Sequence, residues 1–159
     1  MNIARTVNAA ELSFVLDTTV LIHVFRMRCI DHVPGLNLRF ESPRVVVGEY
    51  AQREHRRSSV ARTFPWLKVV GDPTSFFPMA EGLGPGERAA ITLCASDRDH
   101  RVFVSDDLKA KREAVRLGIS SVDSTALFAM IYCKGLTGQI EFIAHLRHVL
   151  SIRPAQAGS

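Results

Sequence analysis

The chain has 159 residues, of which 47% are hydrophobic and 23% charged, a balance typical of one folded, soluble domain and not of a disordered segment. Its apolar runs are short and broken by charge, and residues 1–10 lack the apolar stretch of a secretory signal, so we expect no membrane span and a cytoplasmic location. The net charge of +4 hints at a polyanionic partner, although such a surplus is more often just a solvated surface.

After residues 1–12, expected to be a flexible extension, the sequence predicts a short buried strand at 13–16 and an apolar helix from Thr18 to about Met27. Asp17 lies at their junction. A carboxylate there can cap the helix by accepting hydrogen bonds from its first N–H groups, which is the usual role of a single Asp. A catalytic role requires further acids at the same edge of the sheet.

A connection over residues 29–39 leads to a second predicted helix, with Ser42 as its cap and Pro43 as its first residue, ending near Arg57. Glu49 lies beside the apolar stripe of this helix, where a carboxylate costs free energy unless something pairs with it. Gly48 precedes it and would let another backbone, or a ligand, come close.

A strand is predicted at 66–70. Three apolar side chains that follow are expected in the core or at a partner contact: Phe76, Phe77 and Met79. Gly84-Pro85-Gly86 then starts a compact helix from Glu87 to about Ala95. The helix dipole favours an anion at Glu87, but a first-turn glutamate is common and indicates little by itself.

The next predicted strand, 101–105, ends in two acids, Asp106 and Asp107. A helix from Leu108 to Leu117 follows and stops at Gly118. The remaining predicted elements are a short strand at 119–122, a helix capped by Asp123 or Ser124 that ends near Tyr132, a helix at 140–150 and a disordered tail at 153–159.

The three cysteines, Cys29, Cys94 and Cys133, are scattered, odd in number and in apolar surroundings. This is typical of buried thiols in a reducing compartment and not of a disulfide framework. None of the six histidines forms a close pair with a cysteine or with another histidine, so a zinc site is disfavoured.

Basic residues gather in two clusters, which sharpens the hint of a polyanionic partner. The first comprises Arg53, His55, Arg56, Arg57 and Arg62, and the second comprises Lys109, Lys111, Arg112 and Arg116. The second cluster directly follows the strand that ends in two acids.

Strands that alternate with helices predict an α/β fold with an open, mostly parallel sheet and helices on both faces. In such sheets the ligand crevice lies beyond the carboxyl ends of the strands. Asp17, Asp106 and Asp107 follow strands at that edge, and Glu49 and Glu87 lie early in helices that begin there. We therefore expect these carboxylates to converge in one cleft.

Carboxylates packed into one cleft repel one another unless a cation neutralises them. Oxygen ligands without histidine or thiolate suit Mg²⁺ or Mn²⁺. Such an ion polarises a phosphoryl oxygen and lowers the pKa of a bound water, which in a basic protein indicates hydrolysis of a phosphodiester. Thr19 and Ser105 are candidate supporting hydroxyls that would orient the acids or a water.

At these residues the sequence resembles the PIN-domain nucleases, and in particular the VapC-type toxins. The resemblance is carried, in the family's order, by LDTTVLI, VVVGEY, GPGERAAITLC and FVSDDLKAKREAVRLGI, over residues 13–123. Each motif is weak alone, whereas the ordered set is fairly specific. The resemblance implies a single PIN-like domain over residues 13–152, a three-layer α/β/α sandwich, and four acids that bind one or two Mg²⁺ or Mn²⁺ ions.

Residue by residue, Asp17, Glu49 and Glu87 match the first three acids of the family. The fourth is Asp107 by the family's T-x-D pattern, or Asp106, which lies nearer the strand. The expected metal ligands are Asp17, Glu87, Asp106 and Asp107. Thr19 stands where the family more often has Asn or Ser, and a hydroxyl can make the same local hydrogen bonds.

The resemblance also implies endoribonuclease activity, by metal-assisted in-line attack of water on an RNA phosphate. It further implies a cognate antitoxin protein and a homodimer. The basic residues would then hold neighbouring phosphates of the RNA, with salt-dependent affinity.

Two other enzyme or signalling classes with an acid after the first strand fit the sequence less well. A phosphatase of the haloacid-dehalogenase kind needs a second Asp where Thr19 stands, and a phospho-receiver domain needs its acidic pair early in the chain. A stronger rival is a PIN-type module that binds RNA or a protein without cutting. The full set of acids argues against it, because a silent domain has no reason to keep mutually repelling carboxylates.

Overall fold

The computed structural model describes residues 12–26, 39–53 and 66–133. Within these ranges strands and helices alternate along the chain: β1 (Ser13–Leu16), α1 (Thr18–Arg26), β2 (Arg39–Pro43), α2 (Arg44–Arg53), β3 (Leu67–Val70), α3 (Pro85–Ala95), β4 (Arg101–Val104), α4 (Leu108–Arg116), β5 (Ser121–Val122) and α5 (Ser124–Cys133). The predicted helix at 140–150, both chain ends, Cys29 and the basic residues from His55 to Arg62 lie outside the described residues. None of the described helices is long and apolar enough to cross a membrane.

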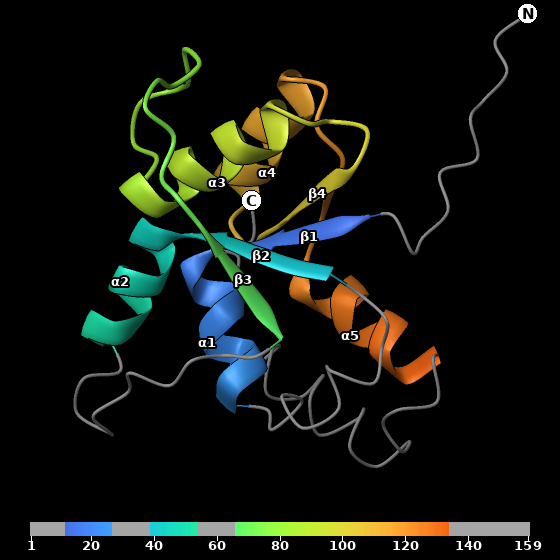
Figure 1. Ribbon diagram of the computed structural model, residues 1–159. Helices are drawn as coiled ribbons and strands as arrows, with labels where there is room; N and C mark the ends of the chain where they lie inside the picture. The colour runs from blue at the N-terminus through green and yellow to red at the C-terminus, as the bar shows by residue number, and fades with distance from the viewer. Residues whose placement is uncertain (1–11, 27–38, 54–65, 134–159) are drawn as a thin grey trace, which may run out of the picture.

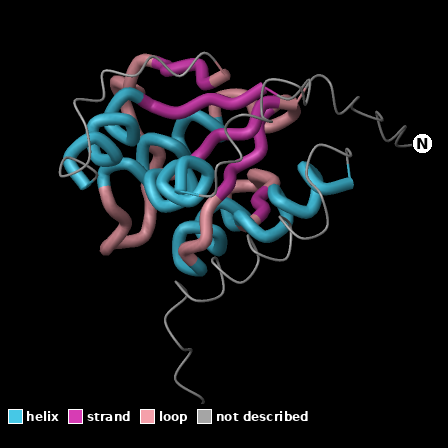
Figure 2. Tube along the Cα trace, turned by 90° about the horizontal axis from the view of Figure 1, so that it is seen from below, coloured by secondary structure: helices cyan, strands magenta, loops and turns pink. Residues whose placement is uncertain are grey.

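The strands form one sheet in the order β3-β2-β1-β4-β5, and every neighbouring pair is parallel. In the view from below, the strands lie side by side and helices pack against them (Figure 2). At the centre, Val15 of β1 lies opposite Glu41 of β2 on one side and Phe103 of β4 on the other. The predicted parallel α/β sheet is confirmed.

Alternating side chains of β1 enter two separate hydrophobic layers. Phe14 and Leu16 pack with buried residues of α1, α2 and α5. Val15 packs with the small and apolar residues of α3 and α4 on the opposite face. The helical layers lie on either side of the sheet (Figure 1), so the apolar run of β1 is buried on both faces, as expected for a central parallel strand.

The prediction for residues 39–43 was wrong. They form β2 between β1 and β3, not a connection followed by a helix cap. The side chain of Ser42 donates to the carbonyl of Leu16 at 2.9 Å, and the first turn of α2 is instead capped by Asp72, whose Oδ1 accepts from Val45 N–H at 2.8 Å. The charge of Glu41 conceals this strand in the sequence, and the structure allows a buried charge there because Glu41 is paired with cations.

Helix boundaries that depend on local capping chemistry agree with the structure. Asp107 caps α4 through a 2.7 Å hydrogen bond from Ala110 N–H to its Oδ1. Gly118 follows that helix with a φ of 74°, a left-handed conformation that glycine adopts without strain. Asp123 accepts from Ala126 N–H at 2.9 Å, so it is the residue that caps α5.

Two expectations about packing are narrowed by the structure. Phe76 and Phe77 are 49% and 40% exposed and are not part of the described core, so a partner contact stays the prediction for them, whereas Met79 is partly buried against the core. Gly48 is exposed, and a Cβ built on it meets no described atom within 4 Å, so no described backbone lies close to it, and the approach of a ligand there stays a prediction. Cys94 is a free, buried thiol, as predicted, and burial raises its pKa.

Candidate functional site

The candidate site lies where the order of the sheet changes direction, between the carboxyl ends of β1 and β4. Asp17 directly follows β1, and Ser105 and Asp106 directly follow β4, its neighbour in the sheet. Crevices at such switch points are the usual ligand sites of open parallel sheets.

Asp17 is only 3% exposed and caps a helix, the first of the two roles considered from the sequence. Its Oδ1 accepts from Val20 N–H at 2.9 Å, which caps α1, and its side chain is also hydrogen-bonded to Ser105. Burial raises the pKa of Asp17 to about 7, and the negative charges of Asp106 and Glu87 contribute to the rise. The folded protein therefore favours the protonated, neutral form of the Asp17 carboxyl group.

Asp106 is surrounded by hydrogen-bond donors. Ser124 N–H donates to Oδ1 at 2.9 Å, Ser124 Oγ lies 2.8 and 2.6 Å from the two carboxylate oxygens, and His23 Nδ1 lies 3.1 Å from Oδ2. Burial pulls the pKa of Asp106 upward, but hydrogen bonds from His23 and Ser124 outweigh it and lower the pKa to about 2. Asp106 is thus held as an anion next to Asp17.

Glu49 and Glu87 meet at the N-terminus of α3. Glu49 Oε1 accepts from Gly86 N–H at 3.0 Å, and Glu49 Oε2 accepts from the hydroxyl of Thr18 at 2.5 Å. Glu87 Oε2 accepts from Gly84 N–H at 2.8 Å, which is the glutamate half of a capping box. Burial raises the pKa of Glu87, and the charges of Asp107 and Glu49 add to the rise.

A close approach does occur in this region, at Gly86 and not at Gly48. A Cβ built on Gly86 would lie 2.6 Å from Oε2 of Glu49, closer than atoms pack. The absence of a side chain at Gly86 therefore lets the carboxylate of Glu49 reach the backbone of α3.

Asp107 is exposed and lies beside Asp106 at the start of α4. Its N–H donates to Ser105 Oγ at 3.1 Å. Both candidates for the fourth acid therefore lie at the site, with Asp106 acting on the pKa of Asp17 and Asp107 acting on that of Glu87. Which of the two serves as the fourth acid stays a prediction.

Three polar residues at the site were not assigned this environment from the sequence. Thr18, and not its half-buried neighbour Thr19, donates to Glu49. His23 and Ser124 contact Asp106. The available signal was weak: His23 is a buried polar residue on an apolar helix face, and Ser124 was considered only as a helix cap.

The donor set fits a hard divalent cation, although the side chains do not form a preformed cage. Within the described parts of the chain, no three Asp, Glu, His or Cys side chains are grouped closely enough to hold a metal ion as they stand. The acids nevertheless present carboxylate oxygens, and the charges of Asp106 and Glu87 are close enough to Asp17 to raise its pKa. A divalent cation would relieve this repulsion, and oxygen ligands are those that Mg²⁺ and Mn²⁺ prefer.

The basic residues of α4 mainly bind other parts of the protein. Arg116 donates to Glu113 and to the carbonyl of Pro78, and Lys109 donates to the carbonyl of Glu81. These contacts tie the segment before α3 to α4. Of the first basic cluster, the structure describes Arg53, whose charge lowers the pKa of Glu87 and which is therefore near the acids.

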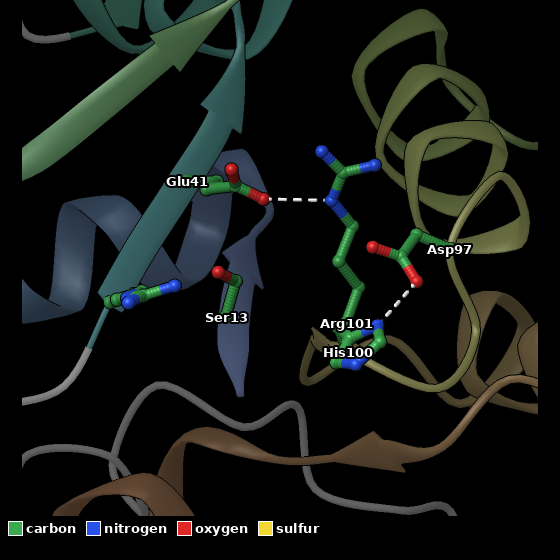
Figure 3. A pocket seen from close by; sticks show the side chains of 6 residues that line it. Ser13, Glu41, Asp97, His100 and Arg101 are labelled. Atoms are coloured by element: carbon green, nitrogen blue, oxygen red, sulfur yellow. Dashed lines mark hydrogen bonds and ion pairs between the residues drawn. The ribbon is translucent and has the colours of Figure 1, made fainter. Parts of the chain in front are cut away.

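A polar pocket of about 420 Å³ lies at the opposite edge of the sheet, where β1, β2 and β4 begin. Its lining comprises Ser13, Arg39, Glu41, Asp97, His100 and Arg101. Figure 3 shows Arg101 reaching Glu41, with Nε 2.8 Å from Oε2, and His100 contacting Asp97. Nη1 of Arg101 also donates to the carbonyl of Leu93 near the end of α3, so this ion pair joins two strands to a helix.

Comparison with known proteins assigns the chain to a family. A family model described as a PIN domain (DUF3368) matches residues 13–146. Among solved structures, the fold is similar to a PilT N-terminus domain protein, SSO1118, from the hyperthermophilic archaeon Sulfolobus solfataricus P2. That match has a TM-score of 0.56 and 15% sequence identity, and it covers 76% of this chain and 93% of the other. A search of curated proteins found no match. The chain belongs to the PIN-domain family.

Proposed function

We propose that the protein is a metal-dependent endoribonuclease that hydrolyses RNA phosphodiester bonds, and that it is the toxin of a toxin–antitoxin pair. PIN domains are typically nucleases and generally use divalent metal ions. The observation that carries the proposal is Asp17, a buried carboxyl at the switch point of the sheet, whose charged neighbours are other acids.

The expected ligands of the cation are Asp17, Glu87, and Asp106 or Asp107. A bound Mg²⁺ or Mn²⁺ supplies Lewis-acid polarisation of a phosphoryl oxygen and lowers the pKa of a bound water. It would also compensate the charge that raises the pKa of Asp17 and Glu87 in the protein alone.

Other residues of the chain orient these acids and the substrate. Ser105 holds the carboxyl of Asp17, while Thr18 and Gly86 hold that of Glu49. Arg53, near Glu87, is suited to bind a phosphate next to the one that is cleaved. A single-stranded or structured RNA substrate, a cognate antitoxin and a homodimer are further parts of the proposal, and they rest on the resemblance alone.

The proposal predicts that Mn²⁺ or Mg²⁺ supports cleavage of RNA and that EDTA stops it. Asp17→Asn and Glu87→Gln are each expected to lower the cleavage rate at least about a hundredfold with the fold intact, because each removes a ligand of the cation. The matched control is Glu41→Gln, a buried acid at the opposite edge, which should cleave at the wild-type rate per folded molecule.

Two outcomes would contradict this assignment. Site variants as active as wild type would reject the assigned acids, and persistent cleavage in EDTA would reject the metal. An RNA that binds in the presence of Mn²⁺ but is never cut would favour the non-cleaving binding module. For an active protein, sequencing the 5′ ends made in cells after brief induction would identify the RNA target.

A further inference from the structure

Two helices from opposite ends of the described chain each send one side chain to Asp106. His23 comes from α1, is 3% exposed and places Nδ1 3.1 Å from Asp106 Oδ2. Ser124 is the first residue of α5, is fully buried and contacts both carboxylate oxygens through its hydroxyl, with its N–H on Oδ1. Both oxygens of Asp106 are therefore held by donors that belong to neither β4 nor α4.

His23 lies in a costly position for a polar residue. Its neighbours on the buried side of α1, Val20 and Val24, belong to the hydrophobic core. An imidazole there loses hydration that a leucine would not need, so a core argument alone does not account for it. The contact with Asp106 supplies a partner, and it spans from the middle of one helix to the end of a strand.

The carboxylate that these donors hold is one of the two whose charge acts on Asp17. Asp106 follows the strand adjacent to β1, and its charge contributes to the electrostatics of Asp17. A carboxylate with free rotation would turn away from a second acid toward solvent. Donors on both of its oxygens fix its plane and keep its charge next to Asp17.

We propose that His23 and Ser124 are positioning residues that fix the carboxylate of Asp106 beside Asp17, so that the pair is oriented for a divalent cation before the cation arrives. The inference rests on the proposed function for the identity of the ligand, a hard divalent cation, and extends it to two residues outside the acidic set. Partners that orient a ligating carboxylate typically change metal affinity 10- to 100-fold when they are removed.

The test compares His23→Leu with His23→Asn. Leucine keeps the bulk of the side chain and removes the donor, whereas the amide nitrogen of asparagine can take the place of Nδ1. Binding of Mn²⁺ is measured by titration calorimetry without RNA, and thermal unfolding is followed in EDTA. We expect His23→Leu to weaken Mn²⁺ binding about 10- to 100-fold and His23→Asn to recover most of that loss.

Asp106→Asn as a second background separates positioning from general damage to the fold. If His23 acts through Asp106, His23→Leu should weaken Mn²⁺ binding much less in Asp106→Asn than in wild type. Should His23→Leu fold poorly, Ser124→Ala removes the second donor with less change in volume and should weaken Mn²⁺ binding in the same direction.

Specific results would overturn the inference. They are unchanged Mn²⁺ affinity in both His23→Leu and Ser124→Ala, equal losses in His23→Leu and His23→Asn, or the same loss in the Asp106→Asn background. A wild-type protein that binds no Mn²⁺ would overturn it as well. A wild-type protein that binds Mn²⁺ but cuts no RNA would contradict the nuclease proposal alone. The inference that His23 positions Asp106 would still hold.

Discussion

The edge of the sheet where the strands begin (the amino edge) and the edge where they end (the carboxyl edge) each bury a carboxylate. The two edges compensate the charge of that carboxylate in opposite ways. At the amino edge, Glu41 is 6% exposed and lies 2.8 Å from Arg101 and 3.7 Å from Lys68. At the carboxyl edge, Asp17 is 3% exposed and forms no ion pair with any residue that the structure describes, while Asp106 and Glu87 add like charge. The chain supplies the counter-charge at the first edge and leaves it to a proton or an external cation at the second.

Under the proposed function, this difference separates a structural acid from a functional one. Arg101 also binds the end of α3, so Glu41 belongs to a contact that fastens β2, β4 and a helix together. Asp17 caps its own helix and is hydrogen-bonded to Ser105, both without a counter-charge, and burial raises its pKa. Strongly perturbed pKa values cluster at functional sites, and here the perturbed group lies at the switch point of the sheet, where open parallel sheets usually bind their ligands.

The largest expected effect is the pH dependence of stability in the metal-free protein. Below about pH 4 the carboxyl of Asp17 is protonated in both the folded and unfolded states. Between pH 4 and its folded pKa of about 7 it ionises only in the unfolded chain, so the free energy of unfolding should fall as pH rises, by about 4 kcal/mol in total. Above pH 7 this contribution should be constant.

Denaturant unfolding in EDTA from pH 4.5 to 8 measures this slope, and Asp17→Asn should remove most of it. Glu87 contributes in the same direction, so a smaller slope should persist in the variant. Asp106 acts in a different window, because its pKa of about 2 stabilises the fold above pH 4 and that stability is lost only as pH falls toward 2. An Asp17→Asn protein with the full wild-type slope would show that the carboxyl of Asp17 is not the group responsible.

A smaller effect, on stability alone, is expected at the amino edge. Glu41→Gln should lower the free energy of unfolding by about 1–3 kcal/mol, because it leaves the charge of the largely buried Arg101 without its partner. Lys68→Gln is the matched control: the side chain of Lys68 is 74% exposed, so the loss of its charge should change stability by no more than about 0.5 kcal/mol. Chemical unfolding of both variants checks the contrast, and a Glu41→Gln protein as stable as wild type would remove the distinction between the two edges.

The sequence predicted the elements and acids of the carboxyl edge better than those of the amino edge, for a physical reason. Asp17, Asp106 and Asp107 each follow a buried apolar strand, and the carboxyl ends of parallel strands meet at one edge whatever the details of packing. β2 was missed because Glu41 and Pro43 disguise it, and only the tertiary pairing with Arg101 shows why a charge is tolerated there. The local sequence pattern predicts a buried strand when its side chains are apolar. It fails when a buried charge is compensated by an ion pair with a residue far away in the sequence.

Side-chain partners in the site were the least predictable part. Adjacent hydroxyls at positions 18 and 19 look alike in sequence, and only the rotation of α1 decides that Thr18 faces Glu49. His23 and Ser124 reach Asp106 from helices that are far apart in the chain. Capping of α5 by Asp123 and termination of α4 at Gly118, by contrast, depend on neighbours within a few residues and followed from the sequence.

The smallest expected effect isolates how the carboxyl edge positions one acid. Gly86→Ala places a Cβ 2.6 Å from Oε2 of Glu49, and because this is the end of a flexible side chain, the carboxylate moves and the fold is kept. We expect RNA cleavage to fall about tenfold while stability changes by less than about 1 kcal/mol.

Gly48→Ala is the control, since it lies next to Glu49 on an exposed stretch of α2 where a Cβ meets no described atom within 4 Å. It should raise stability by about 0.5–1 kcal/mol and leave cleavage unchanged. If both alanines, or neither, slowed cleavage, the contact between Gly86 and Glu49 would not be what orients this acid.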